Sequence, residues 1–136
     1  GFGRLAGFIF GGNQTSAGKS SKIAMTTPVE SIPDSGGYIV VFTMPPEYTM
    51  ANLPKPTDDS VKVREIGPSI VATLRFSGNA RSADIEQLSE DLLARVKKSG
   101  WVVTSTVKVA QYDPPWIPGP LRRNELMVDV RRPTAD

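Results

Sequence analysis

The residues best suited to binding a charged ligand are two neighbouring arginines, Arg122 and Arg123, which precede the last strand-like run of the chain. Guanidinium groups can bind carboxylates such as propionates, or acidic lipid head groups, through paired N–H donors. A structural role is the alternative, in which Asn124 and Glu125 cap loop groups and the arginines pair with nearby acids. The sequence leaves both roles open.

A second group of residues could form an apolar pocket or groove, because its side chains are flexible or aromatic. Core packing is the alternative role for most of them, given their helix and strand spacing. The group consists of Met25, Met44, Met50, Tyr112, Trp116 and Met127, together with the phenylalanines of residues 2–10.

One segment resembles a phosphate-binding loop but lacks its spacing. Residues 12–20 read GNQTSAGKS, and the motif requires a glycine at the position that Asn13 occupies. The motif also leads into a helix, whereas Thr26, Thr27 and Pro28 follow here and favour extended structure. A flexible loop is therefore the better interpretation.

Two absences in the composition exclude most catalytic chemistry. The 136 residues include no histidine and no cysteine, which rules out Ser-His-Asp and Cys-His catalysis, Cys/His zinc sites, histidine-ligated haem and disulfides. The carboxylates of residues 86–91 belong to the solvated side of a predicted helix, and those of residues 58–59 to a loop. Because no pair is placed for hydrolysis, we expect neither an enzyme nor a metal site.

Charge and hydropathy exclude two further classes of partner. Sixteen basic and fourteen acidic residues give a net charge of +2, which is too even to indicate nucleic acid. No apolar run approaches the roughly 20 residues that a membrane helix needs.

Hydrophobic periodicity and turn residues predict one domain with two helices and several short strands. The run at 38–44 is apolar throughout and is expected to be covered on both faces. Gly67 and Pro68 predict a hairpin turn. The expected helices cover residues 2–10 and 83–99, and the expected strands cover residues 23–32, 38–44, 61–66, 70–76, 101–112 and 126–130.

The second helix carries the clearest local signals. Ser82 is the expected N-cap and Gly100 the expected stop. Its buried stripe is expected to consist of Ile85, Leu88, Leu92 and Val96.

The order of elements indicates a repeat. The second half reads strand, turn, strand, helix, strand, connection, strand, and the first half matches only the later part of that order. The pattern predicts that roughly 40–50 residues are missing before Gly1, from ordinary element and loop lengths.

Several motifs resemble those of the SOUL/haem-binding protein family. They occur in the family's order and cover nearly the whole chain. They are IAMTTPV at residues 23–29, YIVVFTMP at 38–45, LPKP at 53–56, VKVRE at 61–65, RFSG at 75–78, QYDPPW at 111–116 and RRNE at 122–125. Residues 2–13 resemble the end of that family's first helix and the turn after it.

The resemblance implies an α+β fold, a distorted antiparallel β-barrel flanked by two helices and built from two ββαββ pseudo-repeats. Residues 1–136 would form a single SOUL-like haem-binding domain that lacks its first strands and most of its first helix. An exposed sheet edge left by their absence would need a partner, such as another protein subunit.

The implied function is non-enzymatic binding of haem or another tetrapyrrole on an apolar surface, as a carrier or buffer. Histidine ligation cannot be carried over; Tyr112, Met25 or Met127 could contact the iron, or an arginine could hold a propionate against apolar packing. The site residues expected on this basis are Leu5, Phe8, Ile9, Met25, Tyr112, Trp116, Arg122, Arg123 and Met127.

The alternative function is that of an accessory or structural subunit of a larger complex, such as a plastid or thylakoid assembly, with a degenerate pocket. The TTP and PPW versions of the motifs look most like plant, algal or bacterial members. A chloroplast location is the expectation that follows, with the cytoplasm as its alternative.

Overall fold

The computed structural model describes residues 2–79, 81–114 and 116–134. The chain divides into two compact units, of which unit 1 comprises residues 1–27 and 42–67 and unit 2 comprises residues 28–41 and 68–136. Secondary structure is mixed, which confirms the α+β class.

Unit 1 is built around the first helix. Helix α1 (Phe2–Ile9) buries Phe8 and Ile9 against Ile23 and Val61. Strand β1 (Asn13–Gln14) pairs with β4 (Lys55–Pro56) in a small two-stranded sheet.

A buried asparagine organises the loop that resembles a phosphate-binding motif. The Asn13 side chain donates to the carbonyls of Phe8 and Ser21, both at 2.7 Å, and accepts from the Ser21 N–H at 3.0 Å. These bonds close residues 13–21 into a loop, so the structure supports the loop interpretation.

Unit 2 contains most of a six-stranded antiparallel sheet, in the order β3-β2-β7-β8-β5 with β6 also paired to β8. Its sheet strands are β2 (Val29–Asp34), β3 (Gly37–Phe42), β5 (Ile70–Ser77), β6 (Val102–Val103), β7 (Lys108–Gln111) and β8 (Arg123–Arg131), and η1 (Gly119–Leu121) is a short 3-10 helix. The strand order has two ends, so the sheet is open and the expected closed barrel is not formed among the described residues.

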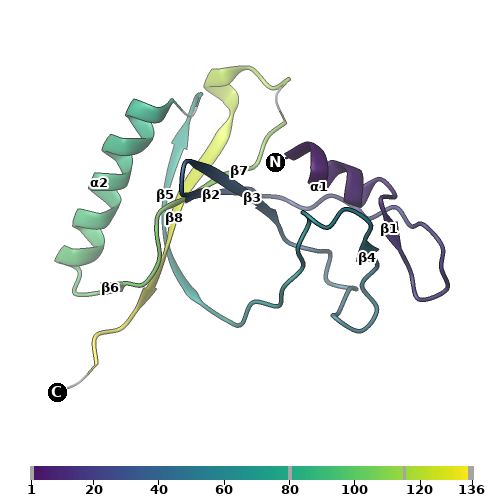
Figure 1. Ribbon diagram of the computed structural model, residues 1–136. Helices are drawn as coiled ribbons and strands as arrows, with labels where there is room; N and C mark the ends of the chain where they lie inside the picture. The colour runs from purple at the N-terminus through teal and green to yellow at the C-terminus, as the bar shows by residue number, and fades with distance from the viewer. Residues whose placement is uncertain (1, 80, 115, 135–136) are drawn as a thin grey trace. The chain divides into compact units, whose positions relative to one another are not determined.

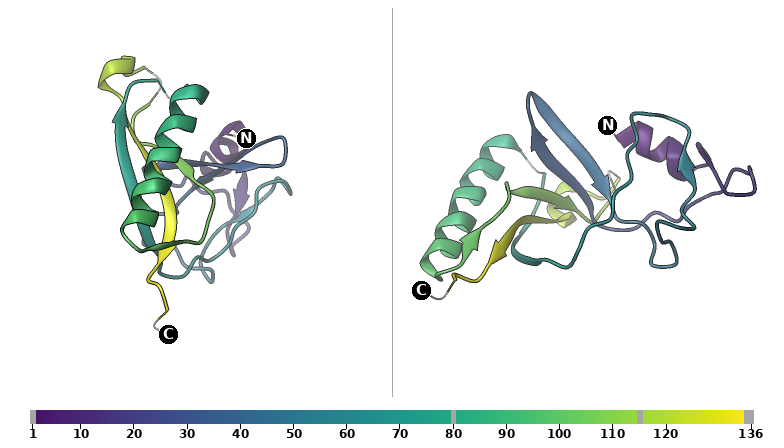
Figure 2. Two further views of the ribbon diagram at one scale, coloured as in Figure 1. Left: turned by 90° about the vertical axis from the view of Figure 1, so that its left-hand side faces the viewer. Right: turned by 60° about the horizontal axis from the view of Figure 1, so that its bottom comes forward.

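Helix α2 (Ser82–Lys98) covers one face of this sheet (Figures 1 and 2). The predicted stripe packs there against alternate residues of β5 and β8. The predicted N-cap was wrong by one residue: Arg81 is the N-cap, in extended backbone and without a side-chain cap hydrogen bond, and Ser82 is already helical.

Three predicted strands differ from the structure. Residues 61–66 form no strand, because Val61 is buried in the core of unit 1 rather than paired in a hairpin. Only residues 29–32 of the predicted 23–32 strand belong to a strand, β2, which continues to Asp34. The predicted 101–112 strand divides into β6 and β7.

The prediction that residues 38–44 are covered on both faces was wrong. Residues 38–42 belong to β3, in which Tyr38 is 63% and Ile39 49% exposed. An apolar run cannot show whether the faces of a strand are covered, because the covering layers are formed by residues distant in the chain.

Strand β8 should dominate the stability of unit 2. Leu126 is fully buried between β5, β7 and α2, so Leu126→Ala should lower the free energy of unfolding by about 2–5 kcal/mol. Leu121→Ala is the matched control, because that side chain is 69% exposed and should change stability little. Urea unfolding followed by circular dichroism measures both; equal effects would contradict this assignment of the core.

Candidate functional site

Four residues predicted to bind a ligand lie in unit 1. Phe8 and Ile9 are core residues, and Leu5 packs against the same core. Met25 is exposed. The apolar side chains of this helix are therefore buried mainly by the core of unit 1, and little of their surface is accessible to a ligand.

Tyr112 is engaged in a polar network on the face of the sheet opposite α2. Its hydroxyl donates to Glu125 Oε2 at 3.1 Å, while Arg75 Nε donates to Glu125 Oε1 at 3.1 Å. Partial burial, together with the bond to the Glu125 carboxylate and its charge, raises the pKa of the Tyr112 phenol above 10.0. The side chain is thus held as a neutral phenol, which disfavours its use as a phenolate ligand to iron.

The two predicted arginines hold the loop that leads into β8. Arg123 donates through Nε and Nη2 to the two carboxylate oxygens of Asp113, at 3.1 and 3.0 Å, and its backbone N–H also bonds Asp113. Arg122 donates to the Ile117 carbonyl at 2.8 Å and to Asn79 Oδ1 at 3.3 Å. Arg123 thus pairs with a nearby acid, as the structural alternative describes, whereas these two bonds of Arg122 go to neutral oxygens.

The remaining predicted residues lie apart from these contacts. Trp116 is 79% exposed in the loop before η1. Met127 is half-buried and lies in register between Thr73 and Lys108, on the face of the sheet away from α2.

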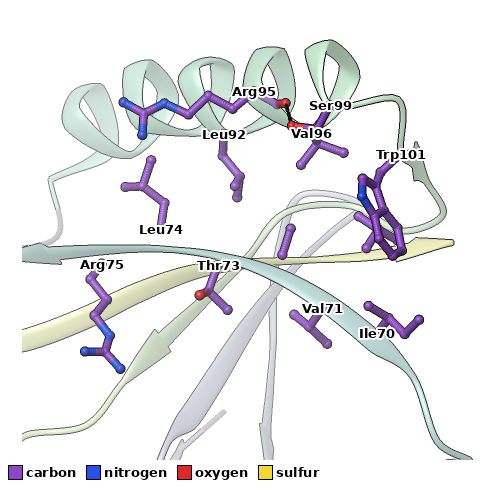
Figure 3. Close-up of a pocket in the computed structure, with 12 residues that line it drawn as sticks. Ile70, Val71, Thr73, Leu74, Arg75, Leu92, Arg95, Val96, Ser99 and Trp101 are labelled. Atoms are coloured by element: carbon purple, nitrogen blue, oxygen red, sulfur yellow. Dashed lines mark hydrogen bonds between the residues drawn. The ribbon is translucent and has the colours of Figure 1, made fainter. Parts of the chain in front are cut away.

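A groove of about 540 Å³ runs between β5 and α2 (Figure 3). Its lining is formed by residues 70–75, by Leu92, Arg95, Val96 and Ser99 of α2, and by Trp101 and Val130. None of the nine predicted site residues belongs to this lining.

The groove combines an apolar floor with cationic side chains. Figure 3 shows Leu74 and Leu92 pointing toward each other between strand and helix, with Trp101 at one end. Arg95 is the charged side chain that α2 contributes to the lining, which includes no carboxylate. Arg75 also belongs to the lining, but its side chain points away from α2 and pairs with Glu125 on the other face of the sheet (Figure 3). Arg132 lies over the Trp101 ring, 5.7 Å from its centre, and adds a second cation beside the groove. Such a site suits a flat apolar molecule that carries carboxylates.

Sequence reasoning missed the groove because its residues read as ordinary core. Leu92 and Val96 belong to the helix stripe, and residues 70–75 alternate as a strand should. Arg95, at the margin of that stripe, is the one sequence signal of a charged rim. Among residues 2–79, 81–114 and 116–134, no cluster of acidic side chains suitable for a metal ion occurs, and no helix could span a membrane.

Comparisons with known proteins agree with the motifs. The family model described as SOUL heme-binding protein matches residues 1–129. Heme-binding protein 1 of Sus scrofa is 30% identical over 126 residues, which cover 88% of this chain and 64% of that protein. The chain thus spans less than two thirds of this relative's length.

The Asp113–Arg123 pair should make stability depend on acidic pH. The hydrogen bonds from Arg123 hold the pKa of the Asp113 carboxyl below its ordinary 3.8. The contribution of the pair is therefore present above pH 3.8 and is lost as the pH falls through the lowered pKa.

The urea midpoint of the wild type should accordingly fall more between about pH 6 and about pH 3 than that of Asp113→Asn. Asp59→Asn, in an exposed loop, is the control and should keep the wild-type dependence. Identical curves for wild type and Asp113→Asn would contradict the assignment.

Proposed function

Because the chain belongs to the SOUL haem-binding protein family, we propose that it binds haem or a related tetrapyrrole without catalysing a reaction. The observation that carries the proposal is the groove between β5 and α2, which joins an apolar floor to Arg95 and the aromatic ring of Trp101. A tetrapyrrole has complementary parts, a flat apolar ring and carboxylate substituents.

Each part of the ligand has a partner of matching chemistry. Leu74 is partly exposed and offers apolar contact to the ring, and Trp101 can stack on it, while Leu92 and Val96 are buried in the core beneath them. Arg95 lies at the rim of the groove and can bind a propionate. Arg75 is a weaker candidate, because its guanidinium already pairs with Glu125.

The groove fits the ring and carboxylates of the ligand rather than its iron. The chain contains no histidine or cysteine, and the lining includes no tyrosine or methionine. Binding without a protein ligand to the metal is weak and reversible, which suits a carrier or buffer better than a redox protein.

A second candidate function, an accessory subunit of a larger complex, is favoured by strand β3. This end strand exposes Tyr38 and Ile39, which are large apolar side chains on an edge that another protein could cover. Stoichiometric co-purification with another protein, and no tetrapyrrole binding, would support this function over the first.

Haemin titration tests the primary proposal. We expect a saturable Soret change at micromolar haemin, weakened about threefold to tenfold by Arg95→Ala, because one charged contact to a propionate is lost. Arg64→Ala is the matched control, an exposed arginine outside the groove whose loss should leave the titration unchanged. A sloping, non-saturable change in the wild type would overturn haem binding, and equal effects of the two variants would overturn the groove as its site.

The proposed absence of an iron ligand gives a separate test. Metal-free protoporphyrin should bind within about threefold of the affinity of haemin, because ring and carboxylate contacts are common to both ligands. Fluorescence quenching of the tryptophans measures both affinities. Much tighter binding of haemin, lost in Tyr112→Phe, would instead indicate a phenolate ligand to the iron.

A further inference from the structure

Strand β5 is an eight-residue end strand of the sheet. Its strand partner is β8, and the register between them runs unbroken from Ile70 opposite Val130 to Ser77 opposite Arg123. The strand has no proline and no bulge, which are common protections of an exposed edge.

Hydrogen bonds of β8 reveal which main-chain groups of β5 face outward. The carbonyls of Arg123 and Asp129 accept bonds from the opposite side of β8, from the N–H groups of Tyr112 and Thr104. Main-chain groups alternate between the two sides along a strand, so Leu126 and Val128 face β5. The main-chain groups of their register partners in β5 therefore point toward β8. The main-chain groups of the β5 residues between those partners point away from β8, toward the open side of the sheet.

The outward groups belong to Val71, Thr73, Arg75 and Ser77. Among the described residues, no hydrogen bond reaches the main-chain groups of these four positions. Each can both donate and accept one bond, so the edge is a ready template for another strand.

We propose that β5 pairs with β5 of a second copy of this chain, antiparallel and about a two-fold axis at Leu74. Only main-chain groups that point outward can bond across the new interface, so each outward residue of one strand must lie opposite an outward residue of the other. The axis can then lie only at Thr73, Leu74 or Arg75 if the strands are to overlap well. An axis at Arg75 sets two like charges directly opposite each other, which is unfavourable. An axis at Leu74 pairs all four outward residues, Val71 with Ser77 and Thr73 with Arg75.

Side chains are also complementary in this register. On the face covered by α2, Leu74 meets Leu74 of the second copy and Ala72 meets Phe76, which continues the apolar layer of the core. On the other face, Arg75 meets Thr73, a neutral partner. No like charges lie opposite each other.

Helix α2 adds charge complementarity to the same two-fold arrangement. Arg95 and Ser99 line the groove, and Asp84, Leu88 and Asp91 fall on the same helical stripe, which therefore borders the β5 side. A two-fold axis normal to the sheet keeps both helices on one face and makes them antiparallel. The acidic half of each stripe then faces Arg95 of the other copy.

A second copy explains the edge better than an unrelated strand, because the surface is complementary to itself. Two-fold pairing forms a closed dimer and covers both β5 edges. Pairing of the β5 edge with a different edge of the next copy would instead leave a free edge on each copy and could continue into a filament. The inference rests on the strand edge and not on tetrapyrrole binding, so either proposal can fail while the other stands.

The mass of the chain in solution tests this proposal. Light scattering after size exclusion, over about 1–100 µM protein, should approach twice the 14.7 kDa chain mass as concentration rises. Thr73→Pro should remain monomeric, because it removes an outward N–H and spares the ladder with β8. Thr73→Val is the matched control, which keeps that N–H and should still dimerise.

Charge at position 73 tests the register even if the proline variant fails to fold. Thr73→Lys faces Arg75 twice in the dimer and should raise its dissociation constant about two- to thirtyfold, whereas Thr73→Glu should lower it by a similar factor. A wild type that stays monomeric at all concentrations would overturn the proposal. So would a dimer that is indifferent to Thr73→Pro and to both charges.

Discussion

Unit 2 depends on the pairing of β8 along both of its sides. β5 bonds one side over its whole length, while β6 and β7 divide the other side between them. Alternate side chains of β8, Leu126, Val128 and Val130, are buried with α2. A strand that is paired on both sides and covered on one face positions everything attached to it, including the floor of the groove.

The same arrangement explains why the groove lies where it does. Helix α2 contacts β5, β6 and β8, but β5 is an end strand of the sheet in the part of the chain that the structure describes. The flank of the helix and the edge of β5 therefore leave an open strip whose floor is apolar because it continues the core. The proposed ligand groove and the proposed strand pairing both depend on this edge of the sheet.

The polar residues near the start of β8 illustrate how one cluster can look like a site and act as a support. Arg123 holds Asp113, Arg122 holds the Ile117 carbonyl, and Asn124 donates to the Gly78 carbonyl at 2.8 Å. These bonds fix the two loops at one end of the sheet. A residue type suited to binding carboxylates binds whichever acceptor the fold places nearest, and that acceptor is not visible in the sequence.

Local patterns succeeded where the deciding contacts are local. The helix of residues 83–99 was predicted to within one residue at each end, because its stripe and its Gly100 stop lie within the segment itself. The alternation of residues 126–130 likewise identified the buried face of β8. The prediction of a hairpin strand at 61–66 was wrong because Val61 packs in the core of unit 1, a contact that no local pattern reveals.

The amino-acid sequence alone determined the family, the α+β class and the absence of histidine and cysteine ligands, because these follow from residue identity and order. Tertiary structure alone decided that Phe8 and Ile9 are buried in the core of unit 1, that both arginines bond to loop residues, and that β5 is an end strand of the sheet among the described residues. Burial, hydrogen-bond partners and strand neighbours are set by residues distant in the chain. They therefore become known only when the chain has folded.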